Sequence, residues 1–123
     1  MKKFFAAAAV MVATVASMLG AAAPAQADYG YYGAIATSRD GAYGIANNYG
    51  SYDDAEQAAV DACGGGGCRV MVSWSNGCGV LASSANMWSA AARSNYTAAR
   101  EAALSRLADG WIVDWRCTAG YSL

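Results

Sequence analysis

Four cysteines, Cys63, Cys68, Cys78 and Cys117, lie in a chain of 123 residues that contains no histidine. An even set of cysteines in a small exported domain is typical of a disulfide framework, because such a domain buries too little surface to be stable without cross-links. Their spacings, with four, nine and 38 intervening residues, differ from the paired spacing of common zinc sites. The sequence therefore predicts two disulfides and no metal site.

The N-terminal segment predicts export. Two lysines precede an apolar, uncharged run over residues 4–19, and a site of small residues follows at 25–27. We expect a signal peptide over residues 1–27, cleavage after Ala27, and a single domain over residues 28–123 that is secreted or held in the cell envelope. An uncleaved membrane anchor is the alternative, since the apolar run approaches spanning length. After cleavage we expect no stable membrane insertion.

The predicted mature chain is mildly acidic. Its 96 residues hold six arginines, nine acidic residues and no lysine, which gives a net charge of −3. Nucleic acids require a basic patch that meets their phosphates, and anionic membranes attract basic segments. We therefore expect no nucleic-acid partner. A chain of this length forms one small domain.

The mature chain contains two similar halves. The matching segments are residues 33–38 with 79–84, 51–60 with 95–104, and 70–74 with 111–115. Their offsets fall from 46 to 44 to 41, so the halves differ in loop length and not in the order of elements. The pattern predicts a duplicated unit of strand, second strand or loop, helix and strand.

Caps and apolar stripes predict two helices. Ser51 and Asn95 are good N-cap residues. The stripes that follow them at helical spacing are Tyr52, Ala55, Ala59 and Ala62 in the first helix, and Tyr96, Ala99, Ala103 and Leu107 in the second. Because alanine is small, such helices would lie close to a sheet.

The strands carry large side chains on one parity. These are Val70, Val72 and Trp74 in the first half, and Trp111, Val113 and Trp115 in the second. Asn76-Gly77 predicts a tight hairpin that places Trp74 opposite Gly79 and brings Leu81 and Ile35 to the same core face. We therefore expect an α+β domain with one mainly antiparallel sheet and two helices packed on one face.

The predicted hairpin also constrains the cysteine pairing. Cys78 lies beside the turn, whereas Cys68 lies at the far end of the hairpin, roughly 20 Å away, and a disulfide spans only about 4 to 7 Å between Cα atoms. Cys63, near Cys68 in sequence, should also miss Cys78. The remaining connectivity is Cys63–Cys68 with Cys78–Cys117. We expect the glycines between Cys63 and Cys68 to form a flexible loop, since no Lys-Ser/Thr follows them as in a phosphate-binding loop.

Four segments carry a resemblance to a known family. They are residues 32–36, residues 63–70 with both their cysteines, residues 78–82 beginning at Cys78, and residues 110–117 ending at Cys117. In these segments the chain resembles domain-of-unknown-function family 4189, small exported bacterial proteins that are frequent in actinobacteria, over about residues 29–119. The resemblance implies export and a compact disulfide-bonded domain. It implies no catalytic residue.

Acid–base chemistry would have to rely on carboxylates, because the chain offers no histidine and no mature lysine as a base. Asp53, Asp54, Glu56 and Asp61 fall on the first predicted helix, where a solvated face and the helix dipole explain them. Asp114 lies between two tryptophans, and carboxylates beside aromatic rings are typical of glycan-cleaving sites. Strand alternation, however, places Asp114 on the opposite face. We expect no enzyme and no cofactor; a weak carboxylate-based cell-wall glycan hydrolase is the alternative.

The sheet face opposite the predicted core is the candidate binding face. Its apolar members are Ala34, Ala36, Met71, Val80, Ala82 and Ile112. A contiguous exposed apolar patch usually marks an interface; burial under the Gly- and Ala-rich stretches at 39–50 and 85–94 is the alternative. We expect an interaction protein with an unknown protein or cell-envelope partner, host-directed roles included, and a homodimer is possible.

Overall fold

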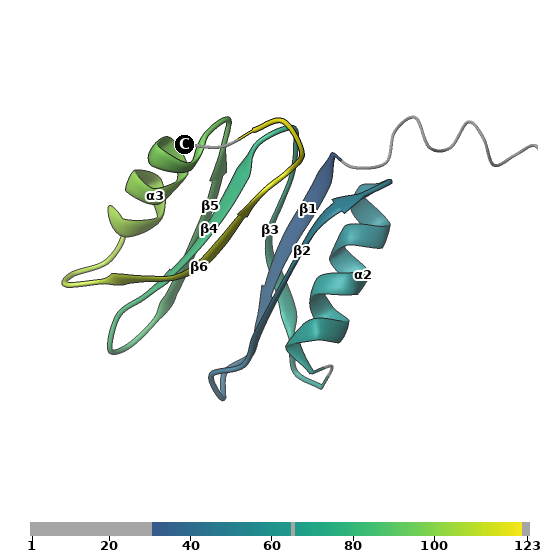
Figure 1. Ribbon diagram of the computed structural model, residues 1–123. Helices are drawn as coiled ribbons and strands as arrows, with labels where there is room; N and C mark the ends of the chain where they lie inside the picture. The colour runs from purple at the N-terminus through teal and green to yellow at the C-terminus, as the bar shows by residue number, and fades with distance from the viewer. Residues whose placement is uncertain (1–30, 65, 122–123) are drawn as a thin grey trace, which may run out of the picture.

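The computed structural model describes residues 31–64 and 66–121 (Figure 1). The predicted signal peptide lies outside these residues. None of the helices in the described part of the chain is long and apolar enough to cross a bilayer.

The chain follows the same order of elements twice. The first unit comprises β1 (Tyr32–Thr37), β2 (Tyr43–Tyr49), α2 (Tyr52–Cys63) and β3 (Arg69–Ser75), and the second comprises β4 (Cys78–Ser83), β5 (Trp88–Arg93), α3 (Tyr96–Leu104) and β6 (Trp111–Cys117). Each unit forms a three-stranded antiparallel sheet with its first strand in the centre, in the orders β2-β1-β3 and β5-β4-β6. The predicted α+β class and order of elements are confirmed.

The two sheets pack face to face, with one helix on each outer face (Figure 1). The predicted single sheet with both helices on one face is therefore wrong. The reason lies in the central strands, which are buried along nearly their whole length. A continuous apolar run needs cover on both faces; α2 or α3 covers one face of each central strand, and the other sheet covers the second face.

The link between β3 and β4 explains the missing hairpin. Asn76 takes the positive φ of 55° that an Asn-Gly turn favours, as predicted. Its N–H donates to the Tyr31 carbonyl, and the Gly77 N–H donates to Thr118 Oγ1 at 2.9 Å. These bonds fix the link at the end of both sheets, so the chain passes from one sheet to the other and β3 pairs with β1.

Both helices begin where the sequence predicts. Ser51 Oγ accepts from the Asp54 N–H at 3.1 Å, and Asn95 Oδ1 accepts from the Ala98 N–H at 2.8 Å. Ala55, Ala59, Ala99 and Ala103 of the predicted stripes are fully buried, at 0% exposure, whereas Ala62 is exposed and Leu107 lies beyond the end of α3. The close helix–sheet packing predicted from the stripes is confirmed.

Trp74 fills the centre of the interface between the sheets. A Cβ atom at Gly33 would lie 2.4 Å from its indole ring, and one at Gly79 would lie 2.2 Å from it. Gly33 and Gly79 hold the same position in β1 and β4, since each is the second residue of its central strand. The two glycines thus make room for one tryptophan, which joins Ile35 and Leu81 in the inter-sheet core.

A β-bulge in β3 and another in β6 change the predicted parity. Met71 is the extra residue in β3, opposite the step from Ile35 to Ala36 in β1. Val113 is the extra residue in β6, opposite the corresponding step in β4. Val70 and Trp115 therefore face the helices and not the inter-sheet core; Trp115 contacts Tyr96 with ring centroids 4.6 Å apart. The paired positions show that these strands match at an offset of 42 rather than the 41 read from the sequence.

Both predicted disulfides are present. Cys63 at the end of α2 bonds to Cys68, and Cys78 bonds to Cys117, which lies directly opposite it in the β4–β6 ladder. The pairing is confirmed although the hairpin used to derive it is wrong. Cys68 directly precedes β3 at one end of the sandwich, whereas Cys78 begins β4 at the opposite end. The two cysteines are therefore still far apart.

Candidate functional site

The predicted binding face is not exposed. Ala34, Ala36, Val80 and Ala82 are fully buried, the first two in the cluster under α2 and the last two in the cluster under α3. Ile112 packs against the α3 cluster. This prediction is wrong because the helices cover the small side chains of the central strands and not the large ones.

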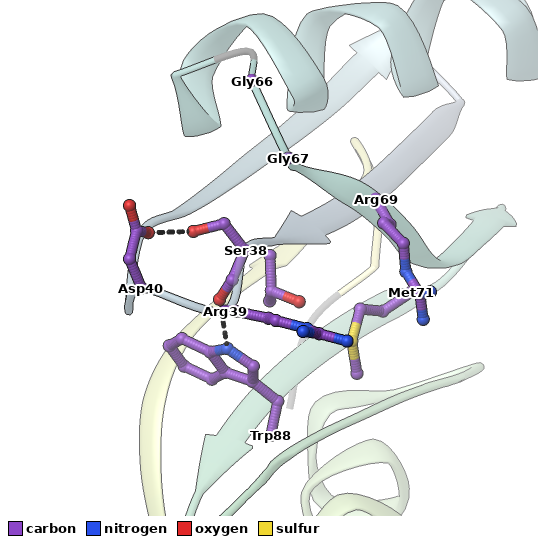
Figure 2. A pocket seen from close by; sticks show the side chains of 9 residues that line it. Ser38, Arg39, Asp40, Gly66, Gly67, Arg69, Met71 and Trp88 are labelled. Carbon is purple, nitrogen blue, oxygen red and sulfur yellow. Dashed lines mark hydrogen bonds between the residues drawn. The ribbon is translucent and has the colours of Figure 1, made fainter.

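Met71 is the one member of that predicted face that is exposed, at 39%. The bulge in β3 turns its side chain away from the helix side, as bulges do when they re-aim a residue. It lines a cleft of about 490 Å³ at the end of the sandwich where β1 ends and β3 begins (Figure 2). The cleft brings together both units of the chain.

Four segments form this cleft. The β1–β2 turn supplies Ser38, Arg39 and Asp40, and the loop closed by the first disulfide supplies Gly66 and Gly67. The start of β3 supplies Arg69 and Met71, while Trp88 comes from the second sheet. The volume falls within the range of small-ligand sites.

Two guanidinium groups face the cleft without a carboxylate partner. Within residues 31–64 and 66–121, Arg39 and Arg69 form no salt bridge; Arg116 pairs with Asp114 at 2.7 Å. Figure 2 shows the Arg39 side chain lying across the cleft above Trp88, with Arg69 on the strand beyond Met71. Asp40 is the only acidic residue in the lining, so the cleft has a net positive charge in a mildly acidic domain.

Trp88 fixes the turn that carries Arg39. Its Nε1–H donates to the Ser38 carbonyl at 3.1 Å, which ties the β1–β2 turn to the second sheet. The Ser38 hydroxyl donates to Asp40, and the Ala42 N–H donates to Ser38 Oγ and to Asp40. The Ser38 hydroxyl, and then the Ala42 N–H, lower the pKa of the Asp40 carboxyl below its usual value. The turn is thus held in place while the Arg39 head group stays exposed.

Tyr43 supports Trp88 from behind. The two rings meet edge to face with centroids 6.2 Å apart, and the Tyr43 hydroxyl donates to Asp114 Oδ2 at 3.1 Å. Burial, together with the hydrogen bond to Asp114, raises the pKa of the Tyr43 phenol. Asp114, the carboxylate on which the alternative glycan hydrolase would rely, therefore links β6 to the first sheet. The prediction that Asp114 lies on the face opposite both tryptophans is right for Trp115, which packs on α3, and wrong for Trp111, because the bulge at Val113 brings Trp111 to the same face as Asp114.

The matches with known proteins follow the same boundaries as the two-sheet domain. Residues 32–122 match the model of the family described as "Domain of unknown function (DUF4189)". This chain belongs to the DUF4189 family. The resemblance noted in the sequence is confirmed.

Mycobacterial members of the DUF4189 family are similar to this chain. Protein Rv1269c of Mycobacterium tuberculosis is 35% identical over 86 residues, which cover 70% of this chain and 68% of the relative. Uncharacterized protein Rv1813c of the same species is 37% identical over 87 residues, which cover 71% of this chain and 60% of the relative. The match thus spans about two thirds of the length of each relative.

A solved structure has a similar fold. The NMR structure of Rv1813c from Mycobacterium tuberculosis superposes with a TM-score of 0.59 at 31% identity, covering 72% of this chain and 75% of that chain. The likeness supports the two-helix, two-sheet architecture.

Sequence reasoning missed Arg39 and Trp88 as site residues. They lie 49 positions apart, and only the packing of one sheet on the other brings them together. The Asp40-Gly41 pair does mark a turn, and Arg69 directly follows Cys68. No pattern in the sequence, however, joins these two signals into one site.

Proposed function

We propose that this chain is an exported, disulfide-stabilised binding domain, without enzymatic activity, that holds the negatively charged group of its ligand in the cleft of Arg39 and Arg69. One observation carries the proposal: two exposed guanidinium groups face one concave site, and no carboxylate among the described residues pairs with them. Guanidinium groups match carboxylate and phosphate geometry, and their hydrogen bonds to anions are among the strong ones.

The surroundings of the cleft support binding and not turnover. Among the described residues of the lining, Asp40 carries the one carboxylate, and it is engaged by Ser38 and Ala42. The partner we propose is a component of the cell envelope or of a host. Val80 and Ala82 are buried beneath α3, so their surface gives no support to self-association through them.

The hydrolase alternative has less support. Asp114 Oδ2 accepts from Tyr43, and Oδ1 accepts from Arg116 and from the Trp115 N–H. These bonds give the carboxylate a structural role between β6 and the first sheet. Replacing Asp114 with Asn would remove any glycan turnover that the alternative requires, and a wild-type protein without turnover would exclude it.

Calorimetric titration of the disulfide-bonded protein with inorganic phosphate tests the proposed function. Arg69→Gln should weaken binding about 10- to 100-fold, because a charge-assisted hydrogen bond contributes about 1.5–3 kcal/mol. Arg100→Gln is the matched control, since Arg100 is exposed on α3, away from the cleft. Equal losses in both variants, or none in either, would refute the cleft as the binding site.

A further inference from the structure

The end of the sandwich that holds the cleft also carries an exposed indole. In the second sheet, Ser83 pairs with Trp88 on one side and with Trp111 on the other. Residues paired in this way point to the same face of a sheet, and their Cα atoms lie two strand spacings apart, or about 10 Å. Trp88 borders the cleft, whereas Trp111 is 52% exposed.

Tyr43 connects Trp88 to β6, the strand that begins with Trp111. Its ring contacts Trp88, and its hydroxyl reaches Asp114 in β6. Aromatic surface therefore continues from the edge of the cleft towards β6. An exposed indole face offers a flat platform for the apolar face of a ring.

Corresponding positions in the two units carry different chemistry. Arg69 pairs with the last residue of β1, and Trp111 pairs with the last residue of β4. One unit thus presents a guanidinium and the other an indole at the same end of the molecule. A ligand that uses both needs a negative charge for the cleft and a flat ring for Trp111, whose Cα lies about 10 Å from that of Trp88 at the edge of the cleft.

We propose that the cleft and Trp111 together bind an anionic polysaccharide, with a carboxylate or phosphate of one sugar at Arg39 and Arg69 and a neighbouring sugar ring stacked on Trp111. This inference rests on the proposed function and names its ligand class. A nucleic acid fits less well, because the mature chain is acidic and phosphate backbones bind through many cationic contacts.

The test compares defined ligands by calorimetry. An oligogalacturonate carries carboxylates on its rings and a phosphomannan carries phosphates, which separates the two sources of charge; neutral mannan and inorganic phosphate supply the ring alone and the charge alone. At least one of the two anionic sugars should bind about tenfold or more tightly than inorganic phosphate, and neutral mannan should bind weakly. Tighter binding of single-stranded RNA than of either sugar would overturn the inference.

Variants of the indole separate this inference from the proposed function. Trp111→Ala should weaken the anionic sugar about tenfold and leave inorganic phosphate unchanged, while Trp111→Tyr should keep most of the sugar affinity. Trp115→Ala is the matched control, because this half-exposed indole lies on the other face of the same strand. If Arg69→Gln abolishes phosphate binding but Trp111→Ala leaves the sugar affinity unchanged, this inference fails and the proposed function stands. If phosphate and both sugars fail to bind, both fail.

Discussion

Single residues decide how closely the two sheets pack. Trp74 is 5% exposed and occupies the space left by Gly33 and Gly79. Within the described residues its Nε1–H has no hydrogen-bond partner, so the ring is held by packing alone. Such a site is sensitive to one added methyl group.

Gly79→Ala should destabilise the protein by about 1–3 kcal/mol, because the new Cβ would meet the Trp74 ring at 2.2 Å and the buried ring has little room to move. Gly66→Ala is the control, since a Cβ there meets nothing within 4 Å. Urea unfolding measures both. A Gly79 variant as stable as the Gly66 variant would contradict the packing described.

Tyr43 gives a prediction for alkaline pH. Its pKa is raised above 10.0, first by burial and then by the hydrogen bond to Asp114, so the fold favours the neutral phenol. The stability from this contact is fully present below pH 10.0 and is lost as the pH rises through the raised value.

Spectrophotometric titration of phenolate formation checks this. The difference between wild type and Tyr43→Phe should show one tyrosine that ionises above its usual pH. Urea unfolding should also show the stability advantage of wild type shrinking above pH 10.0. If the difference between the wild-type and Tyr43→Phe titration curves has its midpoint at or below pH 10.0, the usual pKa of a tyrosine, then Tyr43 is not buried against Asp114.

At the level of elements, each unit is closed by a different device. In the first unit Cys63 bonds to Cys68 between α2 and β3. In the second unit, the link between α3 and β6 is closed by packing of the Leu107 side chain against Gly110. The contact is so close that a Cβ atom at Gly110 would lie 2.5 Å from Leu107. In the second unit, Cys78–Cys117 joins β4 to β6. The corresponding position of the first unit, between β1 and β3, is occupied by the pair Tyr32 and Ser75.

The two disulfides should differ in their contribution to stability. Their sequence separations are 5 and 39 residues. Loop-closure entropy gives about 2 kcal/mol for the short bridge and about 4 kcal/mol for the long one. Unfolding of the Cys63→Ser/Cys68→Ser and Cys78→Ser/Cys117→Ser double variants should therefore show the larger loss in the second. A larger loss in the first would mean that the loop beside the cleft, and not the β4–β6 clasp, limits stability.

Local signals in the sequence predicted the elements well. The caps Ser51 and Asn95 depend only on neighbouring residues and are confirmed, as are the alanines of the stripes except Ala62, which is exposed; Leu107 lies beyond α3. The conformation of Asn76-Gly77 depends on hydrogen bonds to Tyr31 and Thr118, which are distant in the chain. These turn residues therefore form a link between the two sheets and not a hairpin. The bulges at Met71 and Val113 likewise have no local signal; the one in β3 leaves Met71 exposed in the cleft, while the helices bury the other small side chains of the predicted face.

For the whole molecule, the two ends of the sandwich differ in character (Figure 1). One end is closed by the β3–β4 link, the Gly77–Thr118 hydrogen bonds and the Cys78–Cys117 bridge. The other end carries the β1–β2 turn, the loop of the first disulfide, and the two arginines of the cleft. The rigid end secures the fold, and the loop-rich end is where binding is proposed.

Amide chemical-shift mapping during titration of the isotope-labelled protein with inorganic phosphate tests the site of binding most directly. We predict that the amide signals of residues 38–42 and 66–69, and the indole N–H signal of Trp88, shift together with one dissociation constant. The signals of Tyr96 and Trp115, on the outer side of the second sheet, should stay fixed. Shifts confined to Tyr96, Trp115 and their neighbours, with the cleft signals unmoved, would contradict the account.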